Sequence, residues 1–109
     1  MPYTVLLTES AARDLAEIHE YIDLHDSPRK ADTILAKIEK AFQSLAGSPE
    51  RGSHPRELAA LGIREYRQVF FKPYRIIYKV SGRNVYVMLI ADGRRDMQAF
   101  LERRLLEPD

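Results

Sequence analysis

Apolar side chains recur every three or four residues in two stretches of the first half of the chain. The first stretch contains Ala11, Leu15, Ile18 and Ile22, and the second contains Ala31, Ile34, Leu35, Ile38, Phe42 and Leu45. Residues at this spacing lie on one face of an α-helix. The pattern therefore predicts two amphipathic helices, each of which must bury one face against another element.

Polar and turn-forming residues predict where these helices begin and end. Thr8 and Ser27 are suited to cap the two N-termini, and Pro28 fits the first turn of the second helix, where its missing N–H is not needed. Gly47 predicts the end of that helix. Because only a few polar residues separate the two helices, we expect an antiparallel helical hairpin.

Runs rich in β-forming residues predict four strands, one before the hairpin and three after it. The first covers residues 3–7; after an irregular loop over 47–62, the others are expected at 63–71, 74–80 and 85–91. Within 74–80, Tyr74, Ile76, Tyr78 and Val80 fall on one face, and Arg75, Ile77 and Lys79 fall on the other. The run 85–91 is apolar on both faces, which predicts a central strand.

A short helix is expected to close the chain, with Asp96 as its cap and Phe100 and Leu105 on its apolar side. The predicted order is therefore β-α-α-β-β-β-α, which is an α+β fold. We expect the helical hairpin to pack on one face of a mainly antiparallel four-stranded sheet. The length of 109 residues, without repeats or linkers, predicts a single domain over 1–109.

Composition removes several classes of function. The chain has no cysteine, which excludes disulfides and thiolate metal sites, and its three histidines show no metal-ligand spacing. The sequence thus predicts neither a metal nor an organic cofactor. No apolar run approaches the roughly 20 residues of a membrane span, and the N-terminus does not resemble a signal peptide. The expected location is the cytoplasm, with no membrane partner.

Charge is distributed unevenly along the chain, although the net charge is only +1. Residues 1–60 carry 7 basic and 10 acidic side chains, a net −3, whereas residues 61–104 carry 10 basic and 4 acidic ones, a net +6. This asymmetry favours a basic working face on the C-terminal half. An equally weighted interpretation is that these arginines occupy solvent-facing strand positions without a special role.

An ordered set of short motifs across nearly the whole chain resembles the ParE/RelE toxin superfamily. The matching segments are Ala12-Arg13-Asp14-Leu15, Ser48-Pro49-Glu50-Arg51-Gly52, Gly62-Ile63-Arg64, Tyr74-Arg75-Ile76-Ile77-Tyr78 and Ile90-Ala91-Asp92-Gly93-Arg94-Arg95-Asp96. The Gly-Arg-Arg-Asp segment is the most distinctive of them. The resemblance implies a RelE/ParE-like fold and the toxin of a type II toxin–antitoxin (plasmid stabilisation or stress) system that causes growth arrest.

Two activities occur in this superfamily. RelE-like members cut messenger RNA on the ribosome, whereas ParE-like members inhibit DNA gyrase and have no known nuclease site. Both kinds are held inactive by a cognate antitoxin. The resemblance therefore implies a ParD-like antitoxin, which would also read the operator DNA that the pair represses.

Residues at the positions of the RelE-like nuclease site favour the ParE branch. In an ungapped alignment, its lysine pair falls on Tyr66 and Gln68, and its late tyrosine falls on Leu101, beside Phe100. Its two phosphate-binding arginines fall on Arg75 and Arg95. Proton transfer needs groups other than arginine, which stays protonated. Another nuclease branch uses a late histidine, and no histidine follows His54. We therefore predict no catalytic residues, with a gyrase-binding toxin as the first hypothesis.

The alternative is a ribosome-dependent endoribonuclease that uses Arg75, Arg95 and Arg64, since a gap in the alignment could place Arg64 or Lys72 in the site. For the gyrase hypothesis, the expected target-binding residues are Arg64, Arg75, Arg94 and Arg95. Arg75 could instead pair with a carboxylate inside the sheet, and one of Arg94 and Arg95 is expected to pair with Asp96 or another acid.

Two further expectations concern the surface. Leu58, Leu61, Phe70 and Phe71 are predicted as exposed apolar residues that bind the antitoxin beside the hairpin and the sheet. The acids Asp14 and Glu17 are expected to be solvated on the outer face of the first helix.

Overall fold

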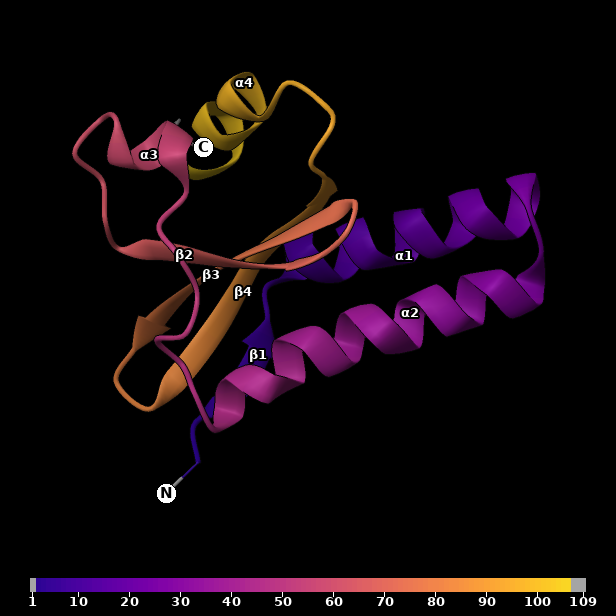
Figure 1. Cartoon of the computed structure of the whole chain (residues 1–109), viewed down its shortest axis with the longest axis horizontal. Coiled ribbons are helices and arrows are strands. Elements are labelled where there is room, and N and C mark those ends of the chain that lie inside the picture. The colour runs from indigo at the N-terminus through magenta and orange to yellow at the C-terminus, as the bar shows by residue number, and fades with distance from the viewer. Residues whose placement is uncertain (1, 107–109) are drawn as a thin grey trace.

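The computed structural model describes residues 2–106 and has three layers (Figure 1): a helical hairpin, a sheet, and short helices on the far side. The elements are β1 (Thr4–Leu7), α1 (Glu9–His25), α2 (Pro28–Gln43), a 3-10 turn (Ser44–Ala46), α3 (Arg56–Ala59), β2 (Tyr66–Phe71), β3 (Tyr74–Ser81), β4 (Asn84–Asp92), α4 (Met97–Leu101) and a π-helical turn (Glu102–Leu106). The predicted α+β order is confirmed. The helix α3 is an addition, within a loop that was expected to be irregular.

The four strands form one mixed sheet in the order β1-β4-β3-β2. β1 pairs with β4 in parallel, and the β4–β3 and β3–β2 pairs are antiparallel. The strand β4 is therefore an inner strand, as its apolar sequence predicts. β2 begins three residues later than expected, because Gly62 has a φ of 79° and the N–H of Ile63 bonds back to the carbonyl of Leu58.

The predicted caps of the helices are present. The Thr8 hydroxyl accepts a hydrogen bond from the N–H of Ala11 at 3.1 Å, and the Ser27 hydroxyl accepts one from the N–H of Lys30 at 3.1 Å. Asp96 does the same for α4 through the N–H of Ala99 at 3.2 Å. Each cap satisfies a backbone donor that the first turn of a helix leaves unpaired.

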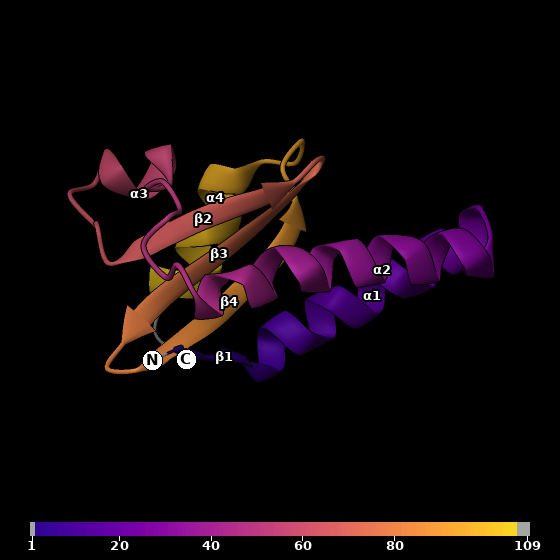
Figure 2. The ribbon, with the colours of Figure 1, turned by 60° about the horizontal axis from the view of Figure 1, so that its bottom comes forward.

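Side chains alternate between two cores on the two faces of the sheet. The hairpin face buries Ile38, Phe42, Ile76 and Tyr78 among others, and the opposite face buries Leu58, Ile77, Leu89 and Leu101. The predicted two-faced pattern of β3 is thus confirmed. Figure 2 shows that the hairpin extends well beyond the sheet. Among residues 2–106, no helix is long and apolar enough to cross a membrane.

Candidate functional site

Arg75 is held in a closed ion pair on the face of the sheet that lies away from the hairpin. Its Nη1 and Nη2 donate to the two carboxylate oxygens of Glu57, both at 2.8 Å, and Nε and Nη2 donate to the Oε1 of Gln68 at 2.9 and 2.6 Å. The side chains of Arg75 and Glu57 are only 12% and 22% exposed. Arg75 therefore pairs with a carboxylate, as one interpretation predicted, but the carboxylate comes from α3 and not from the sheet.

The ion pair fixes the charge of Glu57. The hydrogen bonds from Arg75 lower the pKa of the Glu57 carboxyl below its ordinary value, and they outweigh burial, which acts to raise it. Glu57 is consequently ionised at neutral pH. Because its two oxygens already accept from Arg75, the guanidinium is largely neutralised where it lies.

A cavity of about 710 Å³ opens beside this pair, and we call it the β2 cavity. Its walls are the loop before α3, α3 itself, the open end of the β2–β3 ladder, and α4. Around Arg75 and Glu57 they present His54, Gln68 and Phe70, and Gln98 contributes from α4. This volume falls in the range of small-molecule sites.

Gly93 leaves the space that the Arg75 side chain occupies. A Cβ atom at Gly93 would lie 2.9 Å from Cδ of Arg75, 3.0 Å from its Cγ and 3.2 Å from the carbonyl oxygen of Pro73. The N–H of Gly93 also donates to that carbonyl at 2.8 Å. The glycine of the Gly-Arg-Arg-Asp segment thus lets the end of β4 pass close to Arg75.

Gly93→Ala is expected to lower the free energy of unfolding by about 1–3 kcal/mol, because the added methyl group displaces either the Arg75 stem or the backbone at Pro73. The matched control is Gly47→Ala, since no atom lies within 4 Å of a Cβ placed there. Guanidinium denaturation at pH 7 measures both. Similar losses in the two variants would contradict a close approach specific to Gly93.

The two arginines after β4 have different surroundings. Arg94 is 77% exposed and donates to Asp92, with Nε to Oδ1 at 2.9 Å and Nη2 to Oδ2 at 2.6 Å. Its hydrogen bond is also the main cause that lowers the pKa of Asp92. Arg95 is exposed, and its guanidinium lies 3.8 Å from the ring centre of Phe100. The expected acid partner of this segment is therefore Asp92, while Asp96 caps α4.

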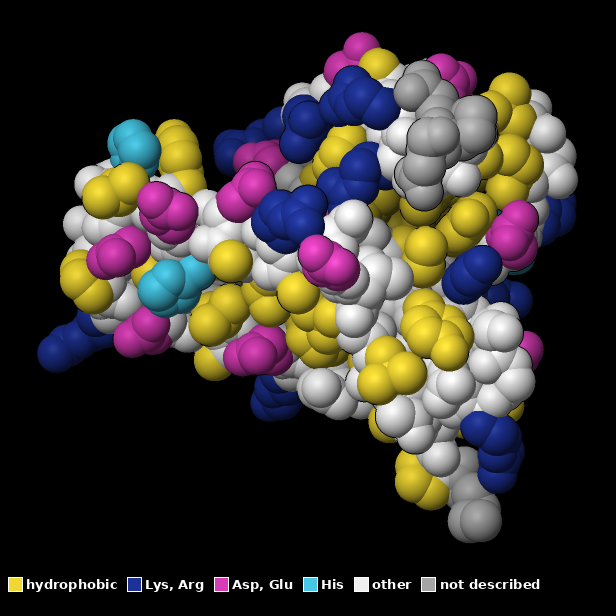
Figure 3. Space-filling view, turned by 180° about the vertical axis from the view of Figure 1, so that it is seen from behind, with side chains coloured by type: hydrophobic (Ala, Val, Ile, Leu, Met, Phe, Trp, Pro, Cys, Tyr) yellow, Lys and Arg dark blue, Asp and Glu magenta, His cyan; other side chains and the backbone are white. Residues whose placement is uncertain are grey.

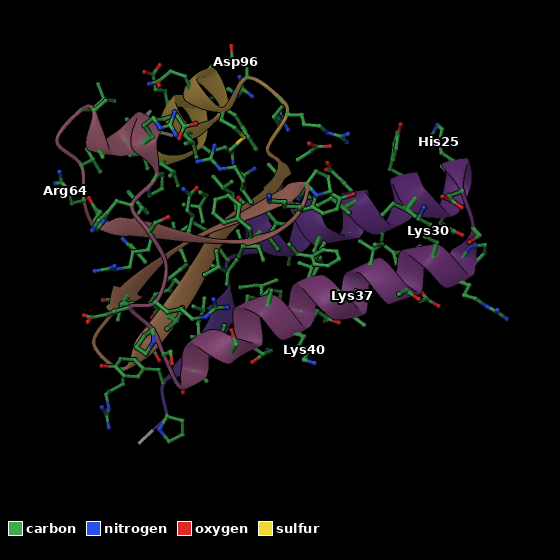
Figure 4. All side chains as sticks on the ribbon, in the orientation of Figure 1. His25, Lys30, Lys37, Lys40, Arg64 and Asp96 are labelled. Atoms are coloured by element: carbon green, nitrogen blue, oxygen red, sulfur yellow. The ribbon has the colours of Figure 1, made fainter. Side chains whose placement is uncertain are left out.

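The four predicted target-binding arginines do not form one surface. Arg64 is exposed and precedes β2, at the end of the sheet far from Arg75 and the segment that leads to Asp96 (Figure 4). Arg94 and Arg95 lie beyond the other end of the sheet. On the face seen in Figure 3, several Lys and Arg side chains gather around the C-terminal elements, whereas the hairpin presents acids, histidines and hydrophobic side chains with few basic ones.

Asp14 is a correction to the sequence analysis. Its side chain is 14% exposed, and its two oxygens accept from Arg104 at 3.0 Å each, while Oδ2 also accepts from the N–H of Ile90 at 3.1 Å. Glu17 is exposed as expected. Asp14 lies three residues after Ala11 and four before Ile18, so the helical spacing itself places it beside the buried stripe.

Leu58 is a second correction, because its side chain is 0% exposed. The single turn of α3 directs it into the core on the far face of the sheet, so it is not available to a partner. Phe71 is half-buried against the hairpin core, with the ammonium of Lys37 6.0 Å from its ring centre. Of the four predicted apolar contacts, Leu61 and Phe70 are exposed, at 52% and 50%.

Comparison with known proteins identifies the family. The family model described as "ParE toxin of type II toxin-antitoxin system, parDE" matches residues 5–97, which is most of the chain. The chain belongs to the ParE toxin family. The toxin ParE3 of Caulobacter vibrioides is 26% identical to this ParE-family chain over 100 residues, which are 92% of the chain and 96% of ParE3.

Solved structures show the same fold as this ParE-family chain. The chromosomal ParDE toxin–antitoxin system of P. aeruginosa matches with a TM-score of 0.71 at 20% identity, covering 83% of the chain and 95% of its relative. A free mutant of the E. coli toxin RelE matches with a TM-score of 0.60 at 18% identity, covering 97% and 100%. The RelBE2 toxin–antitoxin complex of Mycobacterium tuberculosis matches with a TM-score of 0.58 at 24% identity. The match covers 84% of the chain and 99% of the RelBE2 chain. The predicted ParE/RelE-like fold is confirmed.

Proposed function

We propose that this toxin of the ParE family inhibits DNA gyrase by binding to it, without chemistry of its own, and that a ParD-like antitoxin neutralises it. The observation that carries the proposal beyond the family is the closed pair of Arg75 and Glu57. A nuclease would need this arginine to stabilise the charge that develops on a scissile phosphate. With both guanidinium edges on protein acceptors, Arg75 is a poor phosphate ligand.

The positions that supply proton transfer in RelE-like nucleases point the same way. Tyr66 is 6% exposed, and burial raises its pKa above the ordinary value, so it is a poor proton donor at neutral pH. Gln68 does not titrate, and Leu101 is 0% exposed. These residues do not form a general acid and base pair around Arg75.

A supercoiling assay with purified gyrase tests the proposal. We expect the toxin to inhibit supercoiling of relaxed plasmid at near-stoichiometric amounts, and addition of the cognate antitoxin to restore it. Unchanged supercoiling at a large molar excess of toxin would contradict gyrase as the target. Primer extension on translated messages provides the parallel control: cuts at fixed codon positions that vanish in Arg75→Ala would establish the endoribonuclease alternative instead.

The antitoxin is the other proposed partner. The relatives from P. aeruginosa and M. tuberculosis are both toxin–antitoxin systems, which supports an antitoxin for this chain as well. Leu61 and Phe70 supply exposed apolar area for it, whereas Leu58 does not. Operator DNA would be contacted through the antitoxin, and the location in the cytoplasm remains part of the proposal, since gyrase acts there.

A further inference from the structure

The β2 cavity contains hydrogen-bond donors that the described residues leave unused. Gln68 is 8% exposed, and the Oε1 of its amide accepts both bonds from Arg75. That contact fixes the orientation of the amide, so its Nε2 points away from Arg75. No residue among 2–106 accepts from Nε2, although Gln68 lines the cavity. A nearly buried amide thus presents two N–H donors to the cavity.

His54 and Arg75 also line the cavity, and they differ in what they offer a ligand. The Nδ1 of His54 lies 3.1 Å from the carbonyl oxygen of Tyr66, and because a carbonyl only accepts, Nδ1 carries the proton. In this tautomer the Nε2 of His54 is an acceptor, so His54 gives the cavity no further donor. Arg75 has five N–H groups, of which four donate to Glu57 and Gln68, and the fifth, on Nη1, has no acceptor among residues 2–106.

The backbone of β2 is open beside the cavity. Gln68 exchanges two hydrogen bonds with Ser53 on the outer side of β2, at 2.8 and 3.2 Å, so its N–H and C=O point away from β3. Phe70 is two residues later, and its N–H and C=O therefore point the same way. Within the described part of the chain neither has a partner, and the Phe70 side chain is 50% exposed. The backbone of the β2 edge is thus paired at Gln68, by Ser53, and unpaired at Phe70 within the described residues.

The charges of the residues that line the cavity indicate which side chain of a partner it would bind. Glu57 is already neutralised by Arg75, and Arg56 at the rim is exposed, so the three groups sum to +1. Amide donors and a residual positive charge complement a carboxylate, which only accepts. A phosphodiester strand fits less well, because nucleic acid does not add to a strand edge.

We infer that the β2 cavity captures the carboxylate of an Asp or Glu side chain on an extended segment of the toxin's protein target, which pairs with the open edge at Phe70. One strand residue would exchange hydrogen bonds with the Phe70 backbone, and its acidic neighbour would reach the free amide donors of Gln68. The identity of the target as gyrase rests on the proposed function. An antitoxin that covers Phe70 would exclude this segment by occupying the same edge.

Nuclear magnetic resonance titration of the full-length ¹⁵N-labelled toxin tests the cavity without gyrase. The probes are acetyl-Val-Glu-Val-Glu-Val-amide and the same peptide with glutamine in place of glutamate. We expect the glutamate peptide to shift the Gln68 side-chain amide and the Phe70 backbone amide, with at least about tenfold higher affinity than the glutamine peptide. Equal affinities, or shifts confined to the hairpin, would overturn the inference.

Two pairs of variants locate the contacts. Gln68→Glu keeps an acceptor for Arg75 but replaces the free donors with a negative charge, whereas Gln43→Glu makes the same change at an exposed position at the end of α2. Phe70→Pro removes the outward N–H without touching the β2–β3 ladder, and Phe70→Ala removes only the ring. We expect Gln68→Glu and Phe70→Pro to lose binding of the glutamate peptide relative to their controls. Unchanged binding in both would overturn the inference.

The same variants separate this inference from the proposed function. If the wild-type toxin inhibits gyrase and Gln68→Glu does not, while Gln43→Glu inhibits normally, the target uses the cavity. Inhibition by Gln68→Glu at wild-type strength would overturn its use on gyrase. If wild-type toxin leaves gyrase unaffected, the proposed function fails, and the peptide titration still decides the cavity. Tighter binding of a single-stranded RNA oligonucleotide than of the glutamate peptide would overturn the assignment to a protein segment.

Discussion

Asp14→Ala is expected to lower the free energy of unfolding by about 3 kcal/mol, the lower end for a broken buried ion pair. The variant leaves the guanidinium of Arg104, which is 21% exposed, without its carboxylate. It also leaves the N–H of Ile90, on β4 beyond the last residue that pairs with β1, without an acceptor. The lower end applies because Arg104 can turn partly towards water and keeps the carbonyl oxygen of Met88 as an acceptor at 3.3 Å.

The matched control is Glu17→Ala, one turn further along α1, where the side chain is exposed. We expect the free energy of unfolding of this variant to change by less than about 0.5 kcal/mol. Urea denaturation followed by circular dichroism measures both. A loss in Asp14→Ala no larger than in Glu17→Ala would show that the contact between α1 and the C-terminal segment does not stabilise the fold.

Glu57→Ala is expected to lower the free energy of unfolding by a similar or larger amount, about 3–5 kcal/mol at pH 7. Arg75 is 12% exposed, so without Glu57 its charge is buried with only the Gln68 amide as partner. The effect should be largely relieved in the double variant Glu57→Ala with Arg75→Met, which removes the stranded charge. A double variant as unstable as the single one would contradict this explanation.

The ion pair also predicts a dependence on pH. The pKa of Glu57 is lowered in the folded protein relative to the ordinary value of 4.5, so its contribution is fully present above that value and is lost as pH falls through the folded pKa. The wild-type protein should therefore lose stability below about pH 4.5, and Glu57→Gln should lose less over the same interval. Thermal denaturation between pH 7 and pH 3 measures this, with Glu39→Gln, an exposed position on α2, as the control.

Local signals in the sequence predict the elements of this fold well. Thr8, Ser27 and Asp96 cap their helices because the interaction lies within three residues of the cap itself. The alternation of β3 between Ile76 and Ile77 is likewise a local property, and it assigns each side chain to its core. Such contacts are determined by neighbouring residues, so periodicity and residue type are sufficient to predict them.

The predictions that were wrong concern contacts between segments far apart in the sequence. Asp14 and Arg104 are 90 residues apart, and no local pattern connects them. Leu58 lies in a single turn of helix, too short for periodicity to show which side is buried. In the candidate site, Arg75 was recognised as important, but its partner Glu57 comes from that same short helix. The position of the β2 cavity follows from this packing and had no signal of its own.

The strand formed first along the chain pairs with the strand formed last. β1 aligns Thr4 with Asn84, and the Arg104 guanidinium then bonds back to α1. During translation, β1 therefore has no strand to pair with until β4 has left the ribosome. The apolar faces of the hairpin stay uncovered by the sheet for the same time. The sheet can therefore close only after β4 has left the ribosome. The edge at Phe70 and the arginines after β4 become a stable surface only from that point on.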